Sequence, residues 1–187
     1  MGEMGGKFWH ERVDGGGKWS TVARLGPTIE ANGAEVAQVG KGKPMFLGTH
    51  APRLDDKGRL VLPAKFREQL AAGLVLTKGQ DRSIVVWPAA EFAAYSERLN
   101  EASRSDARVR AYLRVLFSGA SDEIPDRQGR ITLPPALREY AGLDRDVIVV
   151  GNGTTAEIWD SSAWETYLSN QEDDFSGMDE EVVPGVM

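Results

Sequence analysis

The sequence predicts an α+β fold, mainly β, built from two tandem copies of one small unit with short flanking helices. A 14-residue segment that begins at Asp55 recurs at Asp126, with Asp, Gly, Arg, Leu, Pro, Arg and Glu in the same places. Aromatic residues further along also recur, with Trp87 matched by Trp159. The offset is 71 residues for the first match and 72 for the second, so a unit of about 50 residues occurs twice with one inserted residue.

Each copy opens with a turn. The pattern Asp-x-x-Gly lies between two apolar segments, with Asp55 and Gly58 in the first copy and Asp126 and Gly129 in the second. An aspartate in such a turn accepts hydrogen bonds from the backbone just ahead of it, and glycine tolerates a positive φ. We therefore expect these four residues to orient the two turns.

A short strand and a short helix follow each turn. Residues 59–62 and 130–133 have the composition of strands. Proline then stands at the start of each predicted helix and glycine at its end: Pro63 and Gly73 in the first copy, Pro134 and Gly142 in the second.

A hairpin and a further helix complete each copy. Two apolar runs flank a polar or glycine-containing turn, which is typical of a β-hairpin. Trp87 and Trp159 each end a β-branched run, so we expect them in the core rather than in a ligand site. The runs are residues 74–77 with 84–87, and residues 147–150 with 156–159.

The chain divides into five segments. We expect a disordered Gly-rich extension (1–44), a first unit (45–100), a helical linker (101–120), a second unit (121–168) and an acidic disordered tail (169–187). Residues 45–48 are a candidate strand. Back-translation of residues 40–45 gives a purine-rich stretch ahead of an ATG, as a ribosome-binding site would, so we hypothesise that Met45 is the native start. The alternative is that residues 1–44 form a genuine flexible arm.

Charge is unevenly distributed along the chain. The net charge of −6 splits into +1 for residues 1–44, −1 for residues 45–170 and −6 for residues 171–187. The predicted folded part is therefore nearly neutral, and a nucleic-acid partner would have to meet a local patch. The chain has no cysteine, no apolar run long enough to span a membrane and no secretory signal, which favours a cytoplasmic protein without membrane association.

The sequence does not favour an enzyme. The two histidines, His10 and His50, have no metal-binding spacing, and phosphate-binding glycine loops and the Gly-x-Ser-x-Gly elbow are absent. Asp55 and Asp56 are adjacent, and neither a strand nor a turn would make them an acid–base pair. We therefore expect no catalytic residue, no metal and no cofactor.

One polar pattern remains, Asp-x-x-x-Arg, which pairs Asp55 with Arg59 and Asp126 with Arg130. The arginines could have a purely structural role, in which each pairs with an aspartate within the turns. Alternatively, an oriented guanidinium could bind a phosphate or a guanine edge. Residues 53–68 carry five bases and three acids, whereas residues 122–139 carry three bases and four acids, so the first copy should attract DNA better. A predicted helix after residue 106 carries three more arginines, on a face that is either solvated or DNA-contacting: Arg108, Arg110 and Arg114.

These motifs resemble those of the MraZ family. The resemblance rests on Met-Phe-Leu-Gly from Met45, Leu-Asp-Asp-Lys-Gly-Arg-Leu from Leu54, Leu-Pro-Ala-Lys-Phe-Arg from Leu62 and the second Asp-x-x-Gly-Arg unit, and it covers residues 45 to about 170. It implies two tandem AbrB-like swapped-hairpin units that form an internal pseudo-dimeric β-barrel. It also implies a ring-shaped homo-oligomer.

The resemblance further implies a nucleoid-associated, DNA-binding transcriptional regulator. Such a protein represses its own gene and the adjoining division and cell-wall genes by binding G-rich direct repeats. Family DNA contacts fall here on Arg59 and Arg130, and charge adds Lys57, Lys65 and Arg67 as candidates. Two alternatives stay open, an antitoxin-type swapped-hairpin protein and a ring-forming scaffold.

Overall fold

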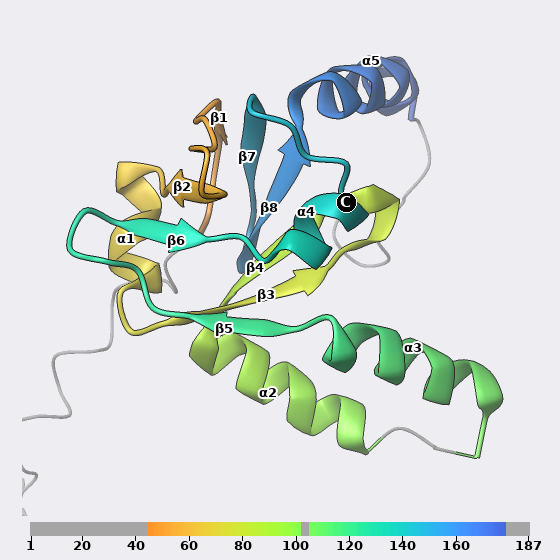
Figure 1. The fold of residues 1–187 in the computed structure, drawn as a ribbon. Helices are drawn as coiled ribbons and strands as arrows, with labels where there is room; N and C mark the ends of the chain where they lie inside the picture. The colour runs from red at the N-terminus through yellow and green to blue at the C-terminus, as the bar shows by residue number, and fades with distance from the viewer. Residues whose placement is uncertain (1–44, 102–104, 179–187) are drawn as a thin grey trace, which may run out of the picture. The chain divides into compact units, whose positions relative to one another are not determined.

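The computed structural model describes residues 45–101 and 105–178, in which a six-stranded antiparallel sheet runs in the order β1-β7-β8-β4-β3-β5 beside a two-stranded ribbon, β2-β6 (Figure 1). The strands are β1 (Thr49–His50), β2 (Arg59–Val61), β3 (Leu74–Lys78), β4 (Ile84–Pro88), β5 (Ser121–Glu123), β6 (Arg130–Thr132), β7 (Val147–Asn152) and β8 (Thr155–Asp160). The helices are α1 (Ala64–Leu70), α2 (Ala89–Asn100), α3 (Ala107–Ser118), α4 (Pro135–Tyr140) and α5 (Ser161–Ser176), with a 3-10 turn, η2, at Gln80–Arg82.

The two copies are related by an internal pseudo-twofold axis. In the ribbon, Leu60 lies opposite Ile131, and these are equivalent residues of the repeat at the 71-residue offset. In the central sheet, Val85 lies opposite Glu157, which are equivalent at the 72-residue offset. When equivalent residues pair in two separate antiparallel ladders, the axis must pass through both pairs. The repeat is therefore a symmetric pair of units within one chain.

The copies also exchange their outer strands. β1, which precedes the first turn, pairs with β7 of the second copy, and His50 lies opposite Val149. β5, which precedes the second turn, pairs with β3 of the first copy, and Leu76 lies opposite Ser121. Neither copy has a complete sheet without the other. The sheet ends at β1 and β5, so the mainly β, α+β class is confirmed and the predicted closed barrel is not confirmed.

The main core lies between the sheet and the layer formed by α1, α4 and the ribbon. Its fully buried side chains come from both copies, with Leu60 and Phe66 facing Ile131 and Leu137. Burial of each such side chain contributes about 1.5–3 kcal/mol. Because both turns stand directly over this core, it fixes the strands that carry them.

The opposite face of the sheet holds an aromatic cluster at each end. Trp87 stacks on Tyr95 of α2 with ring centroids 4.8 Å apart, and Trp159 packs against Trp164 of α5 at 5.5 Å. Trp159 is buried and Trp87 is partly buried. The prediction that both tryptophans belong to the packed interior rather than to a ligand site agrees with these contacts.

Three elements differ from the sequence-based expectation. Residues 45–48 were expected to be a strand, but only Phe46 bridges, to Gly153, and β1 begins at Thr49. β5 is polar, Ser-Asp-Glu, and forms because the edge of β3 offers unpaired backbone groups. α5 continues to Ser176, inside the segment expected to be disordered, because a helix capped by Asp160 propagates cheaply once nucleated.

The predicted boundaries can be compared only in part. α3 lies inside residues 101–120, the segment predicted as a helical linker. The expectations for residues 1–44 and 179–187 lie outside the described residues. Among the residues that the structure does describe, no helix is both long enough and apolar enough to cross a membrane.

Candidate nucleic-acid interface

The first turn holds an arginine rigidly. Asp55 Oδ1 accepts hydrogen bonds from the backbone N–H groups of Lys57 and Arg59, both at 2.9 Å. Asp55 Oδ2 accepts from Arg59 Nε at 2.7 Å. Gly58 adopts a φ of 71° and its N–H bonds the Asp55 carbonyl at 2.8 Å. The Asp55 carboxylate thus both shapes the turn and orients the Arg59 guanidinium.

The second turn repeats this arrangement. Asp126 Oδ1 accepts from the backbone N–H groups of Gln128 at 2.8 Å and Arg130 at 3.0 Å. Asp126 Oδ2 accepts from Arg130 Nε at 2.7 Å, and Gly129 has a φ of 73°. The four residues expected to orient the turns, Asp55, Gly58, Asp126 and Gly129, therefore lie where the sequence predicted them.

Both aspartates are strongly acidic. The pKa of Asp55 is lowered to about 2, first by the side-chain hydrogen bond from Arg59 and then by the Arg59 backbone N–H. The pKa of Asp126 is also lowered to about 2, mainly by the backbone and side-chain hydrogen bonds from Arg130. Both carboxylates stay ionised at neutral pH, so each arginine keeps its charged partner.

The β2-β6 ribbon presents both arginines on one surface. Leu60 and Ile131 point into the core, so alternate residues point outward. Arg59 pairs with Thr132 and Arg130 pairs with Val61, which places the two arginines diagonally across the ribbon. Their side chains are 33% and 31% exposed. We name this outward surface the ribbon face: Arg59, Val61, Arg130 and Thr132.

Two further arginines cross between the copies. Arg67 Nε donates to the Leu62 carbonyl at 2.9 Å, and a Cβ on Gly129 would lie 2.7 Å from Arg67 Cδ. Arg138 is the equivalent residue in the second copy, and its Nε donates to the Leu133 carbonyl at 3.1 Å. A Cβ on Gly58 would lie 2.7 Å from Arg138 Cζ. Each arginine therefore covers the turn glycine of the other copy.

Sequence reasoning named Arg67 but missed Arg138. Arg138 lies 71 residues after Arg67, so the repeat itself carried the signal. The charge count hid it, because the second copy is acidic overall. The structure brings Arg59, Arg67, Arg130 and Arg138 together around the two turns, which gives four guanidinium groups at one surface.

The two predicted lysines are less closely tied to this surface. Lys57 is exposed in the first turn, where the second copy has Gln128. Lys65 is exposed on α1, where the second copy has Ala136. Within the described ranges, Lys65 makes no hydrogen bond or ion pair with the ribbon.

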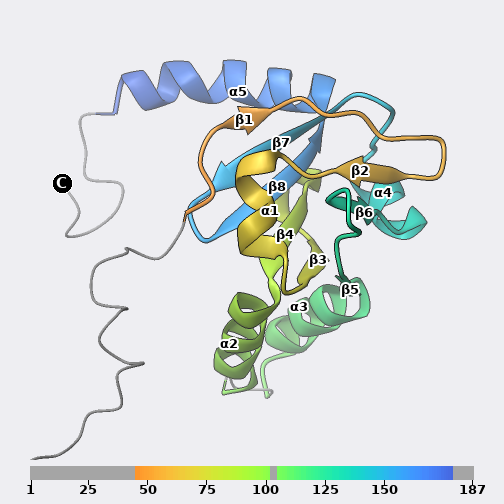
Figure 2. The same cartoon turned by 90° about the vertical axis from the view of Figure 1, so that its left-hand side faces the viewer.

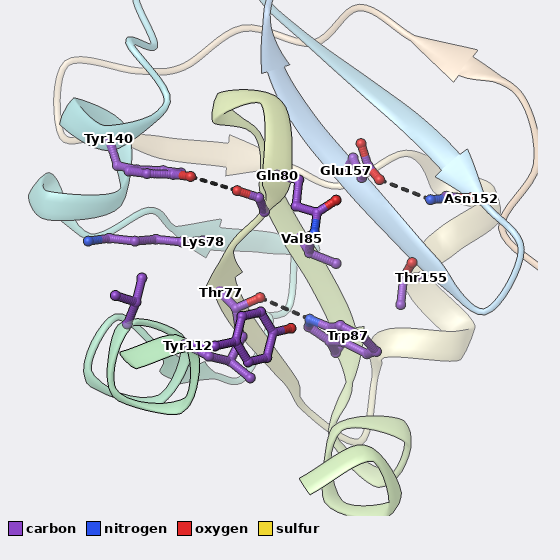
Figure 3. Close-up of a pocket in the computed structure, with 13 residues that line it drawn as sticks. Thr77, Lys78, Gln80, Val85, Trp87, Tyr112, Tyr140, Asn152, Thr155 and Glu157 are labelled. Carbon is purple, nitrogen blue, oxygen red and sulfur yellow. Dashed lines mark hydrogen bonds between the residues drawn. The ribbon is translucent and has the colours of Figure 1, made fainter. Parts of the chain in front are cut away.

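A hollow of about 440 Å³ is lined by residues of β3, β4 and β8, with Tyr112 of α3 and Tyr140 of α4 at its sides (Figure 3). Several of its polar groups bond one another: Trp87 Nε1 donates to Thr77 Oγ1 at 3.0 Å, and Asn152 Nδ2 donates to Glu157 Oε1 at 2.9 Å. The Tyr140 hydroxyl donates to the Gly79 carbonyl at 2.7 Å. These bonds tie the walls of the hollow to one another, and Lys78 Nζ lies 5.1 Å from the centre of the Tyr140 ring.

A known protein family matches this chain twice, once for each copy of the repeat. The family described as "MraZ protein, putative antitoxin-like" matches residues 45–115 and again residues 116–184. The chain belongs to the MraZ family. Its two matches divide the chain at residue 115, inside α3, whereas the sequence analysis placed a separate linker at residues 101–120.

Similar MraZ proteins are named transcriptional regulators. The chain is 61% identical over 142 residues to "Transcriptional regulator MraZ" of Micrococcus luteus, which covers 76% of this chain and 99% of the relative. It is 61% identical over 143 residues to that of Parafrankia sp., covering 76% and 100%, and 58% identical over 142 residues to that of Leifsonia xyli subsp. xyli, covering 76% and 99%. MraZ is a family of transcriptional regulators and not of enzymes.

Proposed function

We propose that the chain is a sequence-specific DNA-binding regulator that represses its own gene and the adjoining division and cell-wall genes. It binds G-rich direct repeats in the promoter as a ring-shaped homo-oligomer, in the cytoplasm and on the nucleoid. The DNA contacts are Arg59 and Arg130, with Lys57, Lys65, Arg67 and Arg138 beside them. Membership of the MraZ family supports the regulatory role.

The ribbon face is the observation that carries this proposal. Two guanidinium groups, each held by an aspartate at 2.7 Å, lie on the outer surface of one two-stranded ribbon. The major groove of B-DNA admits such a ribbon, and an arginine that reaches a guanine can bond its O6 and N7 together. In the second turn Asp126 engages Arg130 through Nε, whereas in the first turn Asp55 Oδ2 also lies 2.6 Å from Arg59 Nη2. The outer side of each guanidinium is the part directed to the base.

A ring explains how a nearly neutral protein can bind DNA tightly. One ribbon face offers few phosphate contacts, so a single chain should bind weakly. Linked copies raise the effective concentration of the next face and increase the affinity by a factor of about 10² or more when their spacing matches the DNA repeats. Direct repeats suit this arrangement because every copy in a ring faces the DNA in the same sense.

The test is a fluorescence-anisotropy titration of the promoter DNA with wild type and Arg59→Ala. The loss of one bidentate base contact should weaken binding by at least about 1 kcal/mol. Arg98→Ala is the matched control, because Arg98 is an exposed arginine on α2, far from the ribbon. Equal binding by Arg59→Ala and wild type would show that the assignment is wrong.

A scaffold and a regulator differ in their response to salt. If the arginines only stabilise the protein, the chain should show no salt-dependent affinity for duplex DNA. If they meet phosphates and bases, the logarithm of the binding constant should fall linearly with the logarithm of the salt concentration. The same titration at four salt concentrations separates the two functions.

A further inference from the structure

The two residues that share the ribbon face with the arginines are not alike. Thr132 lies directly opposite Arg59, and Val61 lies directly opposite Arg130. The strands β2 and β6 lie side by side in both views (Figures 1 and 2). Val61 and Thr132 are both exposed, Val61 at 44%. Each arginine therefore has an exposed β-branched neighbour, which is apolar in one pair and carries a hydroxyl in the other.

This difference breaks the pseudo-twofold symmetry of the ribbon face. The axis exchanges Arg59 with Arg130, which are 71 residues apart. It also exchanges Val61 with Thr132, at the same offset. A face with exact twofold symmetry reads the two halves of its site alike and suits a palindrome. The proposed direct repeats instead require a face that distinguishes the two halves, and on the ribbon face Val61 and Thr132 are the pair that differs.

The two turns beside the ribbon also differ, but they differ in charge. Asp56 and Lys57 of the first turn correspond to Arg127 and Gln128 of the second. Charged side chains that meet phosphates position a protein on DNA and carry no sequence information directly. Sequence is read at the base edges in a groove, where the ribbon face lies in the proposed complex. The ribbon face is therefore the place to look for the residue that gives a site its direction.

Val61 suits one group on the base edges, the C5-methyl group of thymine. Thymine presents this methyl group in the major groove, where apolar side chains contact it. Side chains directly opposite each other on an antiparallel ribbon have Cβ atoms about 5 Å apart. Successive base pairs are about 3.4 Å apart, so a side chain opposite Arg130 reaches the base pair beside the guanine that Arg130 binds. Thr132 presents a hydroxyl that both donates and accepts, and it tolerates any base.

We propose that Val61 reads the C5-methyl group of a thymine beside the guanine bound by Arg130, and that Thr132 makes no such selection at the equivalent position. This inference rests on the DNA-binding function proposed above and names the residue that gives each site its direction. Every copy in an assembly then docks on its repeat in the same sense.

Replacement of thymine by uracil removes the C5-methyl group and nothing else, so it tests this contact directly. Each thymine of the promoter repeat is replaced in turn, and the full chain is titrated by fluorescence anisotropy. At one position in the repeat, wild type should bind about fourfold more weakly with uracil, the value of one buried methyl group. Val61→Ala should bind the unmodified repeat more weakly and show no further loss with uracil. Thr132→Ala, the matched variant across the axis, should keep the full uracil penalty.

Val61→Thr tests the direction of the site. It keeps the shape of the exposed side chain and makes the two halves of the ribbon face alike. Inverting one of two repeats in a duplex should weaken wild-type binding, and it should weaken binding by Val61→Thr by a smaller factor. An equal loss in both proteins would overturn the role of Val61 in direction.

The result is separable from DNA binding itself. A chain that does not bind the repeat, or whose binding is unaffected by Arg59→Ala, would overturn the proposed function and this inference with it. A chain that binds through Arg59 but has no uracil-sensitive thymine would overturn the methyl contact alone. A uracil penalty that persists in Val61→Ala would do the same. Circular dichroism checks that each variant is folded.

Discussion

The two copies of the turn have nearly the same geometry and different surroundings. Arg59 and Arg130 each bond an aspartate through Nε at 2.7 Å, and both aspartates have a pKa of about 2. The first turn carries Lys57 where the second carries Gln128. The arrangement that holds the guanidinium is kept in both copies, whereas the added positive charge is not. We infer that the first copy contributes more to the affinity for DNA, and that both copies hold an arginine in the orientation that DNA contact requires.

The aromatic clusters of the two copies also differ in their surroundings. In the first copy α3 covers the aromatic cluster, and the Tyr95 and Tyr112 hydroxyls bond at 2.8 Å. Burial and this bond raise the pKa of Tyr95 to about 12. In the second copy the equivalent Tyr167 is 37% exposed.

The largest effect on stability should come from substitutions at the pseudo-twofold axis, where equivalent residues of the two copies lie opposite each other. Leu60 and Ile131 are both buried and lie opposite each other. Leu60→Ala and Ile131→Ala should each lower the free energy of unfolding by about 2–5 kcal/mol, because each leaves a cavity beneath the ribbon. The two losses, measured by urea unfolding, should agree to within about 1 kcal/mol.

Val61→Ala is the control for this pair. Val61 points outward and is 44% exposed, so its loss should cost less than about 0.5 kcal/mol. A large loss for only one of the two core variants would break the symmetry between the copies.

Two glycines with a positive φ, one in the first turn and one after α4, should show the next largest effect. Gly58 and Gly142 both have a positive φ, so alanine at either position should cost about 1–2 kcal/mol of stability. Only at Gly58 does the new Cβ meet another side chain, Arg138, whereas nothing lies within 4 Å at Gly142. Gly58→Ala should therefore also weaken DNA binding in a titration, and Gly142→Ala should not. Equal DNA affinities for the two variants would contradict a role for Arg138 at this surface.

Charge differences between the copies should have a smaller effect. Lys57→Gln gives the first turn the residue of the second, and Gln128→Lys does the reverse. If Lys57 meets one phosphate, the first change should reduce the slope of log K against log salt by about 0.9, and the second should increase it by a similar amount. If the slope of log K against log salt is unchanged in both variants, the lysine does not contact a DNA phosphate.

The smallest effect at neutral pH comes from the aspartates. Their folded pKa of about 2 lies below the unfolded value of about 3.9, so their contribution to stability is full above pH 4 and is lost as the pH falls through about 2. DNA binding should therefore not change with their titration between pH 6 and pH 8. A carboxyl NMR titration of Asp55 should give a midpoint near 2 in wild type and a higher one in Arg59→Ala. A wild-type midpoint near 4 would mean that the turn is not closed.

The sequence predicted the parts that local chemistry decides. The two turns, the proline and glycine at the ends of α1 and α4, and the two hairpins follow from residue types and from the repeat. β5 could not be predicted in this way, because Ser121–Glu123 has no strand propensity and pairs only since β3 has a free edge. The exchange of β1 and β5 depends on the tertiary fold, as does the open edge of the sheet.

The candidate site divides in the same manner. The pairing of Asp55 with Arg59 was visible as a four-residue spacing, and its repeat at Asp126 was visible as an offset. The placement of Arg138 over Gly58 was not, because it joins residues 80 positions apart across the pseudo-twofold axis. Local spacing identified the turns, and only the fold identified what covers them.

The central claim is that an aspartate-held guanidinium reads DNA bases from the ribbon face. Arg59→Lys tests it most directly, because it keeps the charge and removes the two-pronged guanidinium. In anisotropy titrations at fixed salt, the variant should lose about 1 kcal/mol or more for the G-rich repeat and almost nothing for unrelated DNA of the same length. An Arg59→Lys variant that binds the repeat as tightly as wild type would contradict the account.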